Sequence, residues 1–241
     1  MKIVDIHTHI LYGVDDGADS IETAIEMLNN AVASDVSAVV LTPHCNHPAV
    51  ERDNYATSDI NERFKKLKEA AHDIPIDIYL GAEAHATKEL PELLDNGLIP
   101  TIGGTKYLLT EFMEDVQKDY CDDMLKEITS RGLIPIIAHP ERYHIICNAP
   151  RLVLDWLDLG CHLQLTAASI TGGFGKTVKK TADFLLGNDL VCCVASDAHG
   201  TKTRTNLLTD VHSYLSLYYS KQYADLLLRY NPECICAGGI L

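Results

Sequence analysis

Ile3-Val4-Asp5-Ile6-His7-Thr8-His9 is the stretch of this sequence that decides the fold. A short apolar run leads directly into two histidines, and apolar runs of this length are typical of buried parallel strands. The same arrangement recurs five times along the chain, each time with a side chain that metal ions favour after the run. The later runs lead to His44, Glu83, Glu111, His139, and the pair Asp197 and His199.

Helical patterns separate most of these apolar runs. In a closed parallel barrel the carboxyl ends of all strands meet on one rim, so side chains far apart in the sequence become neighbours there. The alternation therefore predicts an α/β barrel with its functional site on that rim. We expect strands at 3–6, 36–42, 76–80, 106–110, 134–138, 161–165 and 190–195, a helix to residue 33 capped by Asp19 or Ser20, and helices at 59–72, 89–95, 121–130, 151–158, 176–186 and 206–230.

Length and composition narrow the class of protein. With 241 residues, 46% of them hydrophobic, the chain is expected to form one domain over residues 1–241. The sequence contains no pattern of a secretory signal and no apolar stretch of membrane-spanning length, so no membrane insertion is expected. Its eight cysteines form no CxxC pair, which predicts an absence of disulfides and a cytoplasmic location.

The formal net charge of −14 argues against one class of function. Phosphate backbones are held mainly by clustered Lys and Arg, so we expect no sequence-independent binding of nucleic acid. Bound divalent ions would neutralise several of the acidic side chains. For the acidic residues of the surface, a role in keeping the protein soluble is an equally good explanation as binding of ions.

His7-Thr8-His9 is the sharpest local motif. Alternate residues of a strand face the same way, so imidazoles at positions i and i+2 can bind one ion. Asp5 is predicted to share that face and to orient one imidazole by accepting its second N–H. Two histidines with this spacing are weak evidence by themselves, and their position directly after the first strand strengthens it.

Nine side chains at or near the predicted strand ends make a mixed set of nitrogen and oxygen donors. Such a set is typical of sites for Mn²⁺, Fe²⁺ or Zn²⁺ and differs from a thiolate-rich zinc site. Four or five ligands fill one ion, so nine imply two or three ions, an arrangement used to hydrolyse phosphate esters. The alternative is that the acids at strand ends only cap helices. The candidates are His7, His9, Asp16, His44, Glu83, Glu111, His139, Asp197 and His199.

Motifs for other kinds of phosphate chemistry are incomplete or absent in this sequence. The segment from Gly172 to Thr177 looks like a phosphate loop, but Ile170 stands where its first glycine is required. We expect an ordinary loop before a helix there. No cysteine is followed by arginine six residues later, and the chain has no GxSxG sequence. These absences favour metal-activated water over a nucleophilic side chain.

Seven segments of the chain together resemble a known family, the PHP (polymerase and histidinol phosphatase) superfamily. They most resemble its bacterial manganese-dependent protein-tyrosine phosphatases, which are encoded with enzymes of capsule and exopolysaccharide assembly. The resemblance covers nearly the whole chain, and the Asp-Asp-Gly and His-Pro-Glu-Arg-Tyr elements point to this branch. The segments are Asp5–His9, Asp15–Gly17, Thr42–His44, Gly81–Glu83, Glu111–Phe112, Ala138–Tyr143 and Ala195–His199.

The resemblance implies a distorted, TIM-like barrel of seven strands with three metal ions, Mn²⁺ being the implied metal. It also implies hydrolysis of phosphotyrosine by metal-activated hydroxide. The implied ligands are His7, His9, Glu83 and Asp197 for the first ion, Glu83, Glu111 and His139 for the second, and Asp16, His44 and His199 for the third, with Arg142 and Arg204 binding the phosphate.

This chain departs from the family pattern at two places. No proline follows closely after Arg204, where the family often has one, and Thr166 stands where an asparagine is common. Cys45 and His47, beside His44, either shape the entrance of the site or are ordinary loop residues, and we favour the second interpretation for His47. The other histidines are expected to be structural or exposed; they are His72, His85, His144, His162 and His212.

Three functions from different classes fit the sequence. The first is a tyrosine phosphatase acting on the tyrosine-rich tail of a membrane-attached bacterial kinase, the partner that the resemblance implies. The second is another phosphoesterase on the same scaffold, either a small-molecule enzyme resembling the histidinol-phosphate phosphatases or a nuclease, and the acidic charge counts against the nuclease. The third is a module that binds metal without turnover, and the complete ligand set counts against it.

Overall fold

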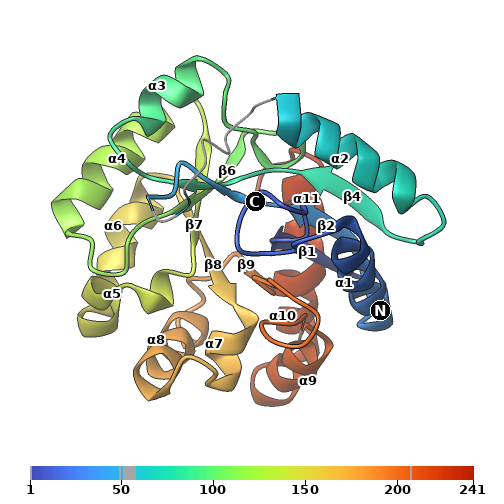
Figure 1. The fold of residues 1–241 in the computed structure, drawn as a ribbon. Coiled ribbons are helices and arrows are strands. Elements are labelled where there is room, and N and C mark those ends of the chain that lie inside the picture. Colours follow the sequence, from blue (N-terminus) through green and yellow to red (C-terminus); the bar gives the residue numbers. More distant parts are fainter. Residues whose placement is uncertain (1, 49, 51–57, 207) are drawn as a thin grey trace.

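The computed structural model describes residues 2–48, 50, 58–206 and 208–241, and Figure 1 shows strands in the middle of the molecule with helices around them. The strands are β1 (Ile3–Thr8), β2 (Val36–Leu41), β3 (His44–Cys45), β4 (Asp77–Leu80), β5 (Glu83–His85), β6 (Tyr107–Glu111), β7 (Ile134–Ala138), β8 (His162–Thr166) and β9 (Cys193–Ala195).

The α-helices are α1 (Ile21–Ala33), α2 (Ser58–Ala70), α3 (Leu90–Asp95), α4 (Lys118–Ser130), α5 (His144–Asn148), α6 (Val153–Asp158), α7 (Ala167–Thr171), α8 (Lys176–Gly187), α9 (Leu208–Tyr218), α10 (Lys221–Asp225) and α11 (Asn231–Cys236). Short 3₁₀ turns lie at η1 (Ile102–Gly104), η2 (Pro140–Arg142) and η3 (Pro150–Leu152), and η4 (Leu226–Tyr230) is a π-helix.

Each pair of neighbouring strands in the described structure is parallel, as expected for alternating strands and helices. One sheet has the order β1-β2-β4, and the other has the order β3-β5-β6-β7-β8-β9. A bridge between Thr8 and Ala198 joins the end of β1 to the segment after β9. The predicted α/β barrel is confirmed.

Two of the predicted strands, 36–42 and 76–80, are each followed after a break by a short strand that the sequence pattern does not predict. The path of β2 resumes in β3 after Pro43, which has no N–H to donate to a ladder. The path of β4 resumes in β5 after Gly81. Across these breaks the N–H of Glu83 donates to the carbonyl of Pro43 at 3.0 Å, and β3 pairs with β5 so that His44 and Glu83 are partners in the sheet.

The barrel interior and the layer between strands and helices form two separate apolar clusters. Alternate strand residues fill the interior, among them Val4 and Ile6 of β1 and Tyr107 of β6, while others pack outward against the helices. At the amino ends of the strands, Ile235 of α11 joins the interior cluster, and Tyr107 Oη donates to the carbonyl of Gly239 at 2.9 Å. The C-terminal segment therefore closes this end of the barrel.

Local signals account for where several helices begin and end. α1 begins after Ser20, whose hydroxyl accepts from the N–H of Thr23 at 3.2 Å, so Ser20 is the cap. Gly175 precedes α8, in agreement with the predicted loop before a helix. The predicted helical tail is longer than expected and is divided into α9, α10, η4 and α11, and β9 is shorter than predicted. In the described part of the chain, no helix has both the length and the apolar character needed to cross a bilayer.

Gly17 marks a very close approach of two segments near the rim of the barrel. A Cβ atom at this position would lie 2.0 Å from the carbonyl oxygen of His9. The N–H of Ala18 donates to the same oxygen at 3.0 Å, which draws the loop onto the strand end. Only glycine fits here, so Gly17 allows Asp15 and Asp16 to lie next to His9.

Replacing Gly17 by alanine is expected to destabilise the protein by about 1–3 kcal/mol, because the added methyl group forces the loop or His9 to move. Gly187→Ala is the control, since a Cβ built there meets nothing within 4 Å apart from its chain neighbours and the backbone of its own helix. Urea unfolding followed by circular dichroism measures both variants. If the two variants are equally stable, the loop moves aside at no cost and the explanation is wrong.

Candidate metal centre

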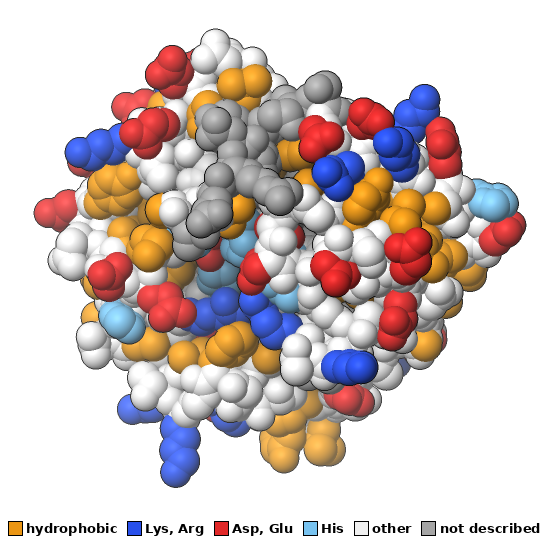
Figure 2. All heavy atoms as spheres, viewed as in Figure 1, with side chains coloured by type: hydrophobic (Ala, Val, Ile, Leu, Met, Phe, Trp, Pro, Cys, Tyr) orange, Lys and Arg blue, Asp and Glu red, His pale blue; other side chains and the backbone are white. Residues whose placement is uncertain are grey.

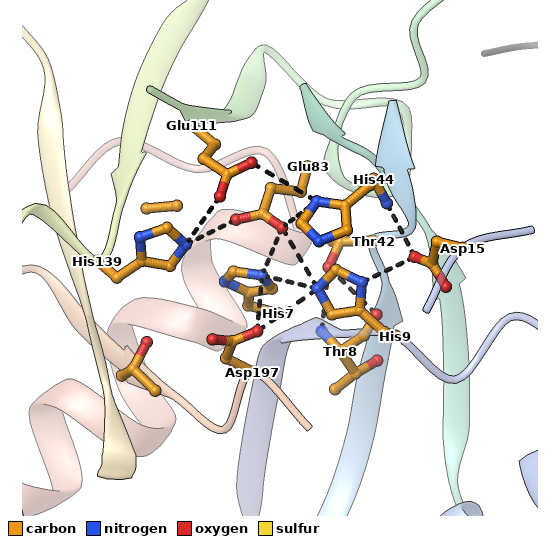
Figure 3. A network of polar contacts seen from close by, with 12 residues as sticks. His7, Thr8, His9, Asp15, Thr42, His44, Glu83, Glu111, His139 and Asp197 are labelled. Carbon is orange, nitrogen blue, oxygen red and sulfur yellow. Dashed lines mark hydrogen bonds and ion pairs between the residues drawn. The ribbon is translucent and has the colours of Figure 1, made fainter. Parts of the chain in front are cut away.

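The structure brings all nine candidate ligands together at the carboxyl ends of the strands. Figure 3 shows His7, His9, His44, Glu83, Glu111, His139 and Asp197 pointing toward one another. In Figure 2, histidine side chains lie in a hollow with acidic and basic side chains around it. Among the described residues, donor atoms within 4.8 Å of one another form overlapping groups. These are His9, Asp16, His44 and His199; His7, His9 and Asp197; His7, Glu83 and His139; and His44, His47 and Glu111.

His7 and His9 point their Nε2 atoms at each other, 3.2 Å apart. His7 Nδ1 lies 2.9 Å from Gln164 Oε1, and His9 Nδ1 lies 2.8 Å from Asp15 Oδ2. Both of these partners are acceptors, so Nδ1 carries the proton in each neutral ring and the two Nε2 lone pairs face one another. A cation beside the two Nε2 atoms would relieve this repulsion between lone pairs, and a divalent metal ion is one that both atoms could bind.

Glu83 occupies the centre of the cluster and is fully buried. Its Oε2 atom lies 3.2 Å from His7 Nε2 and 3.3 Å from His9 Nε2. The same atom is 3.0 Å from His44 Nδ1, and Oε1 is 2.9 Å from His139 Nε2. Burial alone would raise the pKa of Glu83, but His7 and His44 hold this pKa well below its usual range. An ionised carboxylate with imidazoles on both sides can bridge two ions.

Glu111 lies among four imidazoles, two of which, His44 and His139, also contact Glu83. Its Oε1 atom is 3.6 Å from His139 Nε2, and its Oε2 atom is 3.3 Å from His85 Nδ1. The Nε2 atom of His47 is 3.7 Å from the same Oε2 atom, so His47 lies at the edge of the site. His85 is buried. We therefore infer that His85 helps to orient the Glu111 carboxylate.

Asp16, His44 and His199 form a third group at the rim. Asp16 Oδ1 lies 3.3 Å from His199 Nε2 and 3.6 Å from His44 Nε2. The ring of His199 stacks on that of His9 with centroids 3.7 Å apart. The Asp16 side chain is 61% exposed, whereas the carboxylate of Glu83 is fully buried, so this group is the one most open to solvent.

Asp5 does not orient a ligand imidazole, and that prediction is wrong. The pairing of β1 with β2 shifts register after Asp5, so that two residues of β1 oppose one of β2. This bulge breaks the alternation between Asp5 and His7. Asp5 instead accepts from the backbone N–H of Ser196 at 3.0 Å and from the amide of Asn206 at 3.1 Å.

Arg142 and Arg204 both pair with Asp197. Nη2 of Arg142 forms an ion pair with Asp197 Oδ2 and donates to Thr166 Oγ1 at 3.2 Å. Nη2 of Arg204 donates to Asp197 Oδ1 at 3.1 Å, and its Nη1 atom lies 3.6 Å from Asp16 Oδ2. Two guanidinium groups in these positions can bind the oxygens of a phosphoryl group.

Three residues of the site have a strained backbone conformation. His139, Asp197 and Arg204 have positive φ angles of 35°, 54° and 48°. Residues other than glycine seldom adopt this conformation, and it persists only where surrounding contacts hold it. Burial alone would raise the pKa of Asp197, but His7, His9 and Arg142 hold this pKa well below its usual range. The Asp197 carboxylate contacts His7, His9 and Arg142, and such surrounding contacts are what strained backbone conformations need in order to persist.

The chemistry of these donors fits divalent ions of the borderline class. Imidazole nitrogens and carboxylate oxygens are ligands of Mn²⁺, Fe²⁺ and Zn²⁺. Cys45 is buried beside His44, and burial raises the pKa of its thiol, so it is a poor thiolate ligand and a poor nucleophile. The site is therefore suited to bind a phosphoryl group between cations and to expose it to water.

Fold and site define a class of protein: a parallel α/β barrel with clustered imidazole and carboxylate donors on its carboxyl rim. Residues 3–237 match the family described as capsular polysaccharide synthesis, CpsB/CapC, and this chain belongs to that family. The tyrosine-protein phosphatase YwqE of Bacillus subtilis is 34% identical over 90% of this chain and 83% of its own length. The tyrosine-protein phosphatase CpsB of Streptococcus pneumoniae is 30% identical over 97% of this chain and 98% of its own length. The predicted resemblance is confirmed.

Solved structures agree with this assignment. One of the structures of YwqE from Bacillus subtilis and CpsB from Streptococcus pneumoniae, described as unique metal-dependent tyrosine phosphatases, superposes with a TM-score of 0.91 at 30% identity. The superposition covers 99% of this chain and 96% of that chain. The lactonase Lmo2620 of Listeria monocytogenes has a TM-score of 0.63 at 9% identity over 97% of this chain and 94% of its own, which shows a shared fold alone.

Gln164→Leu is expected to weaken Mn²⁺ binding by about tenfold to a hundredfold, because it removes the acceptor that fixes the His7 ring. Gln117→Leu is the control, since Gln117 is exposed and directly precedes α4. Isothermal titration of metal-stripped protein with Mn²⁺ measures affinity, and thermal unfolding checks that both variants fold. Equal affinity in the two variants would contradict an orienting role for Gln164.

Proposed function

We propose that this protein is a metal-dependent protein-tyrosine phosphatase. The observation that carries the proposal is the meeting of nine imidazole and carboxylate side chains with two guanidinium groups at one end of the barrel. The relatives YwqE and CpsB are named tyrosine-protein phosphatases, which supports the same reaction here. That reaction is hydrolysis of the phosphate monoester of tyrosine.

Two or three divalent ions are the proposed cofactors, with Mn²⁺ expected and Fe²⁺ or Zn²⁺ as alternatives. The facing Nε2 atoms of His7 and His9 and the central position of Glu83 support this proposal. Bound ions would supply water of lowered pKa and positive charge beside the phosphoryl group. The proposed ligands are His7, His9, Glu83 and Asp197 for one ion, Glu83, Glu111 and His139 for a second, and Asp16, His44 and His199 for a third.

The chain's own residues bind and orient the substrate. Arg142 and Arg204 would donate to the non-bridging oxygens of the phosphoryl group, and such charged hydrogen bonds strengthen as negative charge spreads over these oxygens. The leaving phenolate needs less help from an acid than an alkoxide would, because free tyrosine has a pKa of about 10. Since Cys45 stays a thiol, water is the nucleophile that this site favours.

The proposed substrate is a tyrosine-phosphorylated protein, in particular the tyrosine-rich tail of a membrane-attached bacterial kinase that controls capsule or exopolysaccharide synthesis. The family's description as one of capsular polysaccharide synthesis supports this setting. We propose a cytoplasmic location, which agrees with the absence of disulfides among the eight cysteines, all of them in described residues. A single domain over residues 1–241, without nucleic-acid binding, completes the proposal.

Metal-stripped protein is expected to release phosphate from a tyrosine-phosphorylated kinase-tail peptide only after Mn²⁺ is added. His139→Ala removes a proposed metal ligand and Arg142→Ala a proposed phosphate ligand, so each is expected to lower kcat/KM by about a hundredfold or more. Lys126→Ala, at an exposed position of α4, is the control and should keep full activity. A colorimetric assay of released phosphate measures the activity of the unchanged protein and of the three variants.

Histidinol phosphate in the same assay separates the proposal from its alternatives. Turnover of histidinol phosphate without turnover of the peptide would assign the protein to the small-molecule phosphatases. Binding of Mn²⁺ without turnover of either substrate would indicate a binding module. Peptide turnover that survives in the Arg142→Ala variant would remove Arg142 from the phosphate site.

A further inference from the structure

The segment Gly172-Gly173-Phe174-Gly175 is not a phosphate loop, yet it lies next to the proposed site. It joins α7, which follows β8 directly, to α8 (Figure 1). The N–H of Gly173 donates to the carbonyl of Ala168 at 2.7 Å, and that of Gly175 donates to the carbonyl of Gly172 at 3.0 Å. Gly172 and Gly175 both have a φ of +91°, which favours glycine. The segment is a tight turn with one large side chain, that of Phe174.

Phe174 lies against the guanidinium group of Arg142. The guanidinium carbon is 4.1 Å from the centroid of the Phe174 ring, well inside the range of a cation–π contact. The Arg142 side chain is 11% exposed, whereas Phe174 is 39% exposed. The Phe174 ring therefore covers the face of the Arg142 guanidinium group that lies toward the turn. Part of the ring remains in contact with water.

The other contacts of Arg142 show why the contact with the Phe174 ring matters for the position of the guanidinium group. Asp197 pairs with its Nη2 atom, and Thr166 accepts from the same atom. Its Nε atom is buried and has no hydrogen-bond partner among the described residues. Asp197 is also a proposed metal ligand, and a carboxylate that shares its charge with a metal holds Arg142 less firmly. An aromatic face attracts the cation without occupying an N–H group.

We propose that Phe174 is a positioning residue, which stacks on Arg142 and holds its guanidinium group in place to bind the phosphoryl oxygens of the substrate. This inference rests on the proposed function, in which Arg142 binds phosphate. Because the stack uses no N–H group, the guanidinium donors stay available to the ligand. The glycines on both sides of Phe174 give the turn the conformation that brings the ring onto the cation.

Binding of inorganic phosphate to the Mn²⁺-loaded protein tests the stack without requiring turnover. Phe174→Leu keeps an apolar side chain but removes the ring, and it is expected to weaken phosphate binding by about threefold to thirtyfold. Phe174→Tyr keeps the ring and is expected to bind phosphate like the unchanged protein. Isothermal titration calorimetry measures the affinities. Undiminished binding in Phe174→Leu would overturn the proposal.

A double-mutant cycle tests whether the loss of phosphate binding in Phe174→Leu depends on Arg142. In an Arg142→Ala background, Phe174→Leu is expected to cause no further loss of phosphate binding, because the ring has no cation left to hold. Leu154→Ala is the control, since Leu154 of α6 is 38% exposed and belongs to no site described above. Thermal unfolding of each variant checks its fold. An equal loss in both backgrounds would show that Phe174 acts independently of Arg142.

Kinetics with the phosphotyrosine peptide separate positioning of Arg142 from direct contact with the substrate ring. Positioning predicts that Phe174→Leu lowers kcat/KM for the peptide by about the same factor as the affinity for inorganic phosphate. A loss confined to the peptide would assign Phe174 to contact with the tyrosine ring and overturn the positioning role. If the unchanged protein does not hydrolyse the peptide, the proposed function fails, while the phosphate titration still decides the stack.

Discussion

The burial of many ionisable side chains at one end of the barrel is the constraint on which this structure depends. Glu83, His7 and His9 are fully buried, and Asp197 and His139 are nearly so. Burying unpaired charges costs several kcal/mol each, so these groups are tolerated only as a mutually compensating set. The facing lone pairs of His7 and His9 and the central carboxylate of Glu83 are groups that bound cations would stabilise further. Folding and metal binding are thus expected to support each other.

Much of the fold follows from the sequence because a parallel barrel has simple rules. Apart from the partly exposed β4, the apolar runs are strands buried on both faces, and the polar residue that ends each run must lie on the carboxyl rim. His44, Glu83, Glu111 and His139 meet there for this reason alone. The register shift after Asp5 could not be predicted in this way, because it depends on how β1 pairs with β2 rather than on the pattern within β1.

The residues that orient the donors are harder to predict from the sequence than the donors themselves. Gln164 lies 157 positions from His7, and no pattern within either strand shows that the two side chains meet. Asp15 stands beside the predicted ligand Asp16, and only the fold of the loop shows which of them faces His9. His85 did leave a signal, since it follows Glu83 by two residues on one strand. That the nine side chains bind metal in the proposed groups stays a prediction.

Asp197 connects the two halves of the proposed site. Its carboxylate interacts with His7 and His9 on one side and with Arg142 and Arg204 on the other. A metal ion bound to this carboxylate would take up part of its negative charge and weaken its pairing with both guanidinium groups, whose donors would then favour a phosphoryl group over Asp197. Metal and phosphate would each make binding of the other more favourable, and such coupling is reciprocal. The aromatic support of Arg142 by Phe174 matters most in that loaded state, because it does not depend on the charge of Asp197.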